Sequence, residues 1–291
     1  MHLNKAIGAA LRAALWLAGL GLAGQEAPPG SLDARWPVTL DRASRLEVMA
    51  YQPSYLLPGR WSDRPNLLPQ TPTQAAQPVS MRGTEAKFQI SFKFMVAALS
   101  EEWRLSLWGA YTQQSHWQAY DAQDSRPFRE TNYEPELMLA WRPDRELAGL
   151  HWRLLTVGID HQSNGRSEPL SRSWNRIMIQ AGLERGNFQL LLRPWLRIRE
   201  SESADNNPDI EHYLGHGEVM AGYRLGGHTF TATSRWNVSS GKGAIQGTWS
   251  FPLHPRLKGY VQVFSGYGES LTDYNWRQNT VGLGFCLNDW L

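Results

Sequence analysis

The sequence predicts an all-β protein, a transmembrane antiparallel β-barrel of about twelve strands. Two observations predict this fold. Apolar and polar residues alternate along many segments, which is the period of a strand whose two faces meet different surroundings. The connections between these segments alternate between short and long, and the number of segments is even, which is the layout of membrane-spanning barrels.

The clearest alternation runs through residues 87–94, which read KFQISFKF and place Phe, Ile, Phe and Phe on one face. Residues 103–111, 188–198 and 281–291 repeat the pattern. A soluble β-sandwich would alternate in the same way, so the pattern alone does not separate the two folds. In a barrel of this size, the polar face with its Lys and Arg residues must form a packed, hydrogen-bonded interior.

The lengths of the connections favour the barrel. Twelve segments are candidate strands: 46–57, 86–98, 103–117, 131–141, 150–163, 174–183, 187–199, 212–224, 228–238, 244–252, 256–267 and 277–291. Most connections on one side are short, which predicts periplasmic turns, and most on the other are longer and polar, which predicts extracellular loops. Each segment has roughly the 9–11 residues that a tilted strand needs to cross a bilayer.

The beginning of the chain has another character. Residues 1–24 combine Lys5 and Arg12 with a run of Ala, Leu and Gly, which is typical of a signal peptide. A short anchor or a buried helix is the alternative. Residues 25–45 have no clear period and are expected to form an exposed N-terminal periplasmic arm, and residues 46–291 the barrel domain. No later segment has the roughly 18 apolar residues of a spanning helix, so a membrane form must be a barrel.

Composition limits the function classes. The net charge of +2 gives a nucleic-acid partner no electrostatic support, and the single cysteine excludes an internal disulfide framework. The 14 Trp residues suit the aromatic girdles of a membrane barrel.

Residues 158–176 hold a set of groups that could perform chemistry. His161 and Ser163 lie two apart on a candidate strand, on the same apolar face as Ile159. On the next candidate strand, Asn175 shares its face with Ile177. After a tight antiparallel return, Asn175 can lie beside His161. The sequence therefore predicts a hydroxyl, an imidazole and an amide in a row on the lipid-facing side of the wall.

This row has the groups of a nucleophilic catalyst. An imidazole can take the serine proton during attack and return it to the leaving group, and a third residue can hold the ring in its productive tautomer. An amide costs less to desolvate on a surface facing hydrocarbon than a carboxylate does. It also stabilises the imidazolium less, so a metal ion could assist the oxyanion. A Ser/His pair at this spacing is common by chance, but polar groups on a membrane face are costly and usually functional.

At these residues the sequence resembles the outer-membrane phospholipase A family of Gram-negative bacteria. The similarity extends from about residue 46 to the C-terminus and is strongest in Pro127–Pro135, His161–Arg176 and Ser265–Leu271 with Asp273-Tyr274-Asn275. The resemblance implies a twelve-stranded barrel in the outer membrane. It also implies that Ser163 is the nucleophile, His161 the base and Asn175 the residue that orients the base.

The resemblance further implies a calcium-dependent homodimer. The matching calcium ligands are the Arg166 carbonyl, the Ser171 hydroxyl and Ser125 from the second copy, which are hard oxygen donors. The backbone N–H of Gly165 matches the oxyanion donor, and Gln113 matches a glutamine of the dimer interface.

Two departures from the family pattern are visible. The family's second calcium site uses two acids. Glu168 matches the first, but Asn206 stands at the second, with Asp205 next to it, so this chain lacks one of the two. The chain also ends in Trp290-Leu291 rather than in an aromatic residue, and Leu291 is expected to continue the apolar face.

The expected function is calcium-dependent hydrolysis of glycerophospholipid acyl esters, of A1, A2 and lysophospholipase type, activated by homodimerisation. Two alternatives from other classes remain. A non-catalytic pore or structural barrel would conduct ions and hydrolyse no ester. A soluble periplasmic β-sandwich esterase would be extracted without detergent, which the outward rows of Phe and Leu disfavour.

Overall fold

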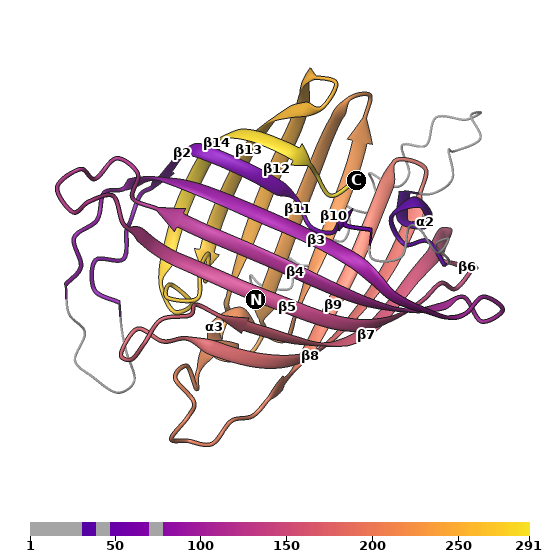
Figure 1. Ribbon diagram of the computed structural model, residues 1–291, viewed down its shortest axis with the longest axis horizontal. Helices are drawn as coiled ribbons and strands as arrows, with labels where there is room; N and C mark the ends of the chain where they lie inside the picture. Colours follow the sequence, from indigo (N-terminus) through magenta and orange to yellow (C-terminus); the bar gives the residue numbers. More distant parts are fainter. Residues whose placement is uncertain (1–30, 39–46, 70–77) are drawn as a thin grey trace.

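The structure is a computed structural model that describes residues 31–38, 47–69 and 78–291, and the expected signal segment 1–24 lies outside the described residues. Twelve long antiparallel strands form a closed barrel (Figure 1), because β3 pairs with both β2 and β4, and β14 returns to pair with β2. The strands are β2 (Ser54–Ser62), β3 (Thr84–Ser100), β4 (Leu105–Trp117), β5 (Phe128–Trp141), β7 (Leu150–Ser163), β8 (Ser173–Arg185), β9 (Phe188–Ile198), β10 (Gly217–Leu225), β11 (His228–Asn237), β12 (Lys242–His254), β13 (Leu257–Tyr267) and β14 (Arg277–Asn288). Among the residues that the structure describes, closure leaves no long edge strand unpaired.

The connections alternate as the sequence predicts. Short turns join β3 to β4, β8 to β9, β10 to β11 and β12 to β13, and β6 (Arg145–Leu147) widens the turn between β5 and β7. The long connections lie at the other end, together with the short turn 238–241; their described residues are 63–69 and 78–83, 118–127, 164–172, 199–216 and 268–276. We call these two ends the short-turn end and the long-loop end.

The first predicted strand is displaced. The long strand is β2, whereas residues before it contribute only β1 (Met49–Ala50), which pairs with β3 farther along the same edge. The chain is irregular between them, where Pro53 has no N–H to donate and its carbonyl accepts from Gln89 Nε2 at 2.8 Å. The strand predicted over 212–224 also starts late, at Gly217, because α3 (Ile210–Leu214) precedes it and buries Ile210 and Leu214 inside the barrel.

Strand parity separates two chemically different faces. Outward residues such as Ile90, Ile159 and Leu283 are about half exposed or more, at 51%, 57% and 61%. Inward residues include Lys87 and Arg176, which are buried and paired. The apolar face is therefore outside and the charged face inside, the reverse of a soluble barrel. No helix among the described residues is long and apolar enough to cross a membrane.

The N-terminal arm is not exposed where the structure describes it. Helix α2 (Ser31–Arg35) lies at the short-turn end, and Leu32 and Trp36 are buried in a cluster with Met95 and Trp108 from the wall. The Arg35 guanidinium donates to the carbonyls of Tyr51 and Trp290. The two apolar side chains explain the difference, because burial inside the barrel removes them from water.

The C-terminus differs as well. Strand β14 ends at Asn288, and Trp290 packs against the same cluster as Trp36. Leu291 is part-buried near Gly222 on the inner face of β10, so it does not continue the apolar outer face. The inward turn of Trp290 explains the difference, since the cluster around α2 offers it an apolar contact.

Candidate active site on the outer wall

His161 and Asn175 lie opposite each other on neighbouring strands. The register of β7 and β8 pairs the two residues, and His161 Nδ1 is 2.8 Å from Asn175 Oδ1. Both side chains share the outward face with the exposed residues Ile159 and Ile177. An amide oxygen only accepts, so this bond requires the proton of the neutral ring to be on Nδ1. The ring then presents the unprotonated Nε2 as a base.

Ser163 lies two residues along β7 from His161, on the same face and closer to the long-loop end. Residues at this spacing are about 7 Å apart along a strand, a gap that the imidazole and the hydroxyl together can span. Ser163 is paired in register with Ser173 on one side and Tyr133 on the other, and it is part-buried. The hydroxyl, the ring and the amide therefore lie in one row outside the lumen.

The Asn175 amide has a second partner that the sequence did not indicate. Its Nδ2 donates to Glu200 Oε1 at 2.8 Å. Glu200 follows the end of β9, whose Ile198 is paired in register with Asn175. The signal that could have found it is parity, because residues 196, 198 and 200 continue one face of the strand.

Asn164 shapes the loop that follows the serine, and sequence reasoning missed it. Its Nδ2 donates to the Leu170 carbonyl at 2.8 Å, and its Oδ1 accepts from the backbone N–H groups of Arg172 at 3.0 Å and Arg166 at 3.3 Å. An asparagine side chain that replaces backbone partners in this way is typical of tight loops. Its place directly after a strand was the available signal.

Gly165 is the next residue of this loop and has a backbone that suits glycine. Its φ is +62°, and a Cβ there would lie 3.0 Å from the Tyr133 ring. A side chain would therefore be both strained and crowded. The exposed backbone of Gly165 lies two residues from Ser163, so its N–H is the candidate oxyanion donor.

The candidate calcium ligands lie in two loops of the long-loop end. Arg166 and Ser171 belong to loop 164–172, and Ser125 lies in loop 118–127, exposed and with a φ of +60°. The Ser171 hydroxyl accepts a hydrogen bond from Asn206 Nδ2 at 3.0 Å, which orients its oxygen and leaves a lone pair free. Carbonyl and hydroxyl oxygens are donors that fit calcium.

Asn206 joins two loops by hydrogen bonds and does not supply the carboxylate that a second calcium site would need. Its Oδ1 accepts from the Ser173 backbone N–H at 2.9 Å while its Nδ2 holds Ser171. Both ends of the buried amide are thus used to join loop 199–216 to loop 164–172. Glu168 is exposed. The pair Glu168 and Asn206 therefore lacks the two acids that such a site needs.

Gln113 belongs to a polar strip on the outer wall. It lies outward on β4, where its Oε1 accepts from the Tyr111 hydroxyl at 3.0 Å and its Nε2 donates to Ser115 Oγ at 3.3 Å. Gln113 is paired in register with Tyr133 of β5, and Tyr133 with Ser163 of β7. The strip therefore leads from β4 to the row of Ser163, His161 and Asn175.

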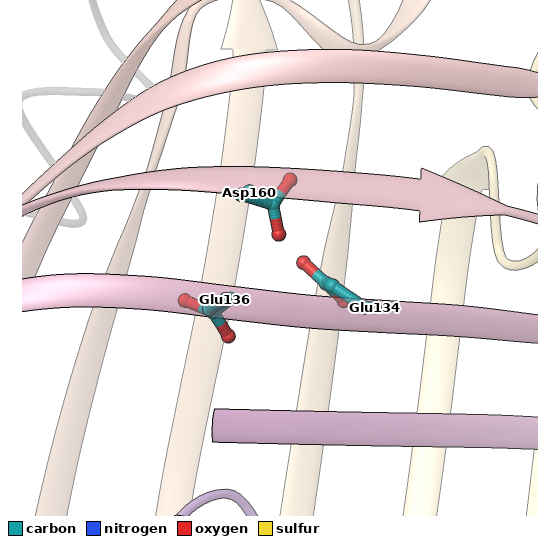
Figure 2. A group of neighbouring side chains, drawn as sticks. All are labelled: Glu134, Glu136 and Asp160. Atoms are coloured by element: carbon teal, nitrogen blue, oxygen red, sulfur yellow. The ribbon is translucent and has the colours of Figure 1, made fainter. Parts of the chain in front are cut away.

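A cluster of acids lies on the inner side of the same strands. Glu134 and Glu136 on β5 and Asp160 on β7 point toward one another (Figure 2), with oxygens within 4.8 Å. Arg176 of β8 compensates them, because its Nε is 2.7 Å from Asp160 and its Nη2 is 2.8 Å from Glu134. The Tyr51 hydroxyl donates to Glu136 at 3.0 Å. This cluster is an internal ion-pair network behind His161 and Asn175, separate from the outer row.

The motifs around residues 130 and 270 meet inside the long-loop end. Glu130 accepts from the Thr272 backbone N–H at 3.0 Å, and Asn132 Oδ1 accepts from the Leu271 N–H at 3.0 Å. Asp273 pairs with Arg129 at 2.8 Å. These contacts tie loop 268–276 to β5, the strand beside the one that bears Ser163.

Replacing Asp273 by asparagine should destabilise this end in a pH-dependent way. Burial alone would raise the pKa of Asp273, but the Arg129 guanidinium and hydrogen bonds from Asn66 and Ser270 hold its pKa below the usual value. A carboxyl with a lowered pKa stabilises the fold above its unfolded pKa of about 4, and this contribution is lost as the pH falls through the folded pKa. Breaking the pair should cost about 3 kcal/mol at pH 7 and progressively less below about pH 4.

Urea unfolding in detergent micelles between pH 2.5 and 7, followed by Trp fluorescence, measures this difference. Asp124→Asn, an exposed aspartate in another loop of the same end, is the matched control. Equal unfolding midpoints of Asp273→Asn and the parent at pH 7 would contradict the prediction.

Known proteins resemble this chain over most of its length. The family model described as Phospholipase A1 matches residues 32–287. The putative phospholipase A1 of Neisseria meningitidis serogroup B is 41% identical over 257 residues, which are 86% of this chain and 67% of that protein.

Two solved structures share the fold. The Salmonella typhi outer membrane phospholipase, solved as a dimer with bound calcium, superposes with a TM-score of 0.79 at 35% identity, over 90% of this chain and 99% of that one. An Escherichia coli outer membrane phospholipase A with an active-site asparagine replaced by alanine gives a TM-score of 0.79 at 34% identity, over 91% and 100%. With its closed barrel and apolar exterior, this chain is an outer-membrane protein and belongs to the phospholipase A1 family of outer membrane phospholipases.

Proposed function

We propose that this protein hydrolyses the acyl esters of glycerophospholipids, at the A1 and A2 positions and in lysophospholipids, with a Ser-His-Asn triad on its lipid-facing wall. The observation that carries the proposal is the hydrogen bond between His161 and Asn175 at 2.8 Å, on an outward face that also holds Ser163. The names of the relatives support a phospholipase activity. The active-site asparagine of the Escherichia coli relative supports an asparagine in the catalytic machinery.

In this proposal Ser163 attacks the ester carbonyl while His161 Nε2 takes its proton. The bond that forms joins Ser163 Oγ to the acyl carbon. The bond that breaks releases the alcohol of the lysophospholipid, which receives the proton from His161. A water molecule, activated by the same ring, then releases the fatty acid and restores Ser163. Asn175 keeps the ring in place throughout, and the Gly165 N–H donates to the oxyanion.

Calcium is the proposed cofactor, held by the Arg166 carbonyl and the Ser171 hydroxyl, with Ser125 of a second copy as the third ligand. Bound there, the ion would add positive charge near the oxyanion that a neutral triad stabilises weakly. The chain's own part is to hold the two oxygens of loop 164–172, through the contacts that Asn164 and Asn206 make. The calcium in the Salmonella typhi relative supports this choice of ion.

A homodimer is the proposed active form. The outward side chains of Tyr111 and Gln113 lie on the wall beside the triad, and a polar strip facing lipid is stabilised by a partner that satisfies it. In this proposal Ser125 reaches the site only from a second copy, so the monomer would be catalytically inactive. The long-loop end would then face the cell exterior and the short-turn end the periplasm. The dimeric state of the Salmonella typhi relative supports the proposal.

The proposal predicts activity that needs both calcium and dimers. Refolded protein should hydrolyse a phospholipid in micelles with calcium, lose at least about 100-fold of the rate in excess chelator, and recover it when calcium is restored. Dilution with detergent, monitored by crosslinking, should reduce the rate in step with the dimer fraction. Undiminished hydrolysis by the chelated protein would exclude the calcium requirement, and full activity of the monomer would exclude the dimer.

A passive pore is the alternative from another class, and the lumen disfavours it. The ion-paired side chains of Arg176, Asp160 and Glu134 project into the interior, and α2 with Trp36 fills the short-turn end. A pore would give ion conductance in planar bilayers with no release of fatty acid.

A further inference from the structure

The Asn175 amide is held from both sides on the lipid-facing wall. Its oxygen receives the bond from His161 at 2.8 Å and its nitrogen donates to Glu200 Oε1 at 2.8 Å. The four groups come from three adjacent strands: Ser163 and His161 from β7, Asn175 from β8, and Glu200 from the end of β9. They form one continuous row on one face.

An orienting amide works in only one of its two orientations. If the Asn175 side chain turned by 180°, its NH₂ group would face His161 Nδ1, which would then have to accept. The proton of the neutral ring would move to Nε2, and the ring could no longer take a proton from Ser163. A carboxylate beside the amide nitrogen removes this ambiguity, because a carboxylate can accept only from the NH₂ group.

Glu200 also supplies the negative charge that the amide lacks. The imidazolium that forms during attack is stabilised by a nearby anion, and in this chain the nearest carboxylate in the row is one amide away. Arg199 adjoins Glu200 in sequence, but its guanidinium is paired with Glu211 at 3.2 Å. The residues paired in register with His161 and Ser163 on β5 and β8 are Tyr133, Ser173 and Asn175; none of them carries a charge at neutral pH, and Tyr133 is the titratable one among them.

We propose that Glu200 is a positioning residue for the triad: it fixes the Asn175 amide with its oxygen toward His161 and places a negative charge behind it, so that the working unit is Ser163–His161–Asn175–Glu200. This inference rests on the proposed function, because it concerns the same site.

Two substitutions separate the two contributions. Glu200→Ala removes both the acceptor and the charge, and it should lower kcat about 10-fold with KM unchanged, since groups in direct contact are coupled by amounts of this order. Glu200→Gln keeps an oxygen that can accept but loses the charge, and it should lower kcat about 3-fold. In both variants the acid limb of the pH–rate profile should move to lower pH by about half a unit, because the protonated imidazole has lost a favourable charge.

Glu202 provides the matched control. It is an exposed glutamate two residues farther along the same loop, so Glu202→Ala and Glu202→Gln change the same net charge on the same segment. Both variants should have the same kcat as the parent and the same acid limb of the pH–rate profile. Glu200 variants that match the Glu202 variants in kcat and in pH profile would overturn the inference.

A double-mutant cycle tests whether Glu200 acts through Asn175. In the Asn175→Ala background, which retains the nucleophile and the base, Glu200→Ala should lower the residual rate less than 2-fold. An undiminished 10-fold loss there would mean that Glu200 acts elsewhere, and would also overturn the inference. Ser163→Ala separates this failure from that of the proposed function. If Ser163→Ala is inactive while the Glu200 variants are normal, only the positioning role is wrong. If Ser163→Ala stays active, the triad itself is wrong.

Discussion

Replacing Ser163 by alanine is expected to abolish phospholipid hydrolysis while the barrel still folds. The substitution removes the only atom that can form the acyl-enzyme bond in the proposed mechanism, and loss of a serine nucleophile costs about 10⁴-fold or more in kcat. The side chain is part-buried on the outer face and lies outside the internal ion-pair network. A smaller side chain there leaves the charged interior unchanged.

The measurement is fatty acid release from micellar phospholipid with calcium present. Folding is checked on the same samples by the difference in gel mobility between unheated and heated barrels. Ser265→Ala is the matched control, since Ser265 is an outward serine on β13, on a distant part of the wall. Hydrolysis by folded Ser163→Ala at the parent rate would rule out Ser163 as the nucleophile.

The largest effect on stability is expected for Arg176→Ala. Arg176 bonds both Asp160 and Glu134, and its removal leaves these two carboxylates without that cation while one oxygen each of Asp160, Glu134 and Glu136 still lies within 4.8 Å of the others. Breaking a buried ion pair by removing one partner costs about 3–5 kcal/mol. Repulsion among the acids adds to the loss, so Arg176→Ala should unfold at clearly lower urea concentration than the parent.

Arg176→Lys should recover only part of the stability. An ammonium is a point charge, whereas the guanidinium spans two carboxylates at once. Arg185→Ala, at the exposed end of the same strand, is the matched control and should unfold like the parent. If Arg176→Ala and Arg185→Ala unfolded at the same urea concentration, the cluster would not stabilise the barrel.

Most of the wall could be predicted from the sequence because successive side chains of a strand point to opposite faces, so residue type alternates when the two faces meet different surroundings. Parity alone put His161, Ser163 and Asn175 on the apolar side, and the structure has all three outside the lumen. The number of strands and the alternation of turns and loops followed from the same pattern. The resemblance to the phospholipase family was confirmed by the comparisons.

The parts that escaped prediction depend on contacts between segments distant in sequence. The arm around α2 has no period, and its burial needs a cluster built from several strands. Glu200 and Asn206 lie in loop 199–216, and their partners are on β8 and in loop 164–172. No local sequence pattern predicts that loop 199–216 contacts loop 164–172. The inward turn of Trp290 depends on the same cluster as α2, so parity at the C-terminus was misleading.

The apolar cluster that Leu32, Trp36 and Trp290 form with the wall at the short-turn end has a consequence for the order of assembly. The Arg35 guanidinium donates to the carbonyl of Trp290, so this cluster joins the first described segment of the chain to its last residues. The cluster also contains Met95, Trp108 and Leu154 from three separate strands. Trp290 follows β14, which closes the barrel by pairing with β2. We therefore expect the short-turn end to be filled only after the barrel has closed.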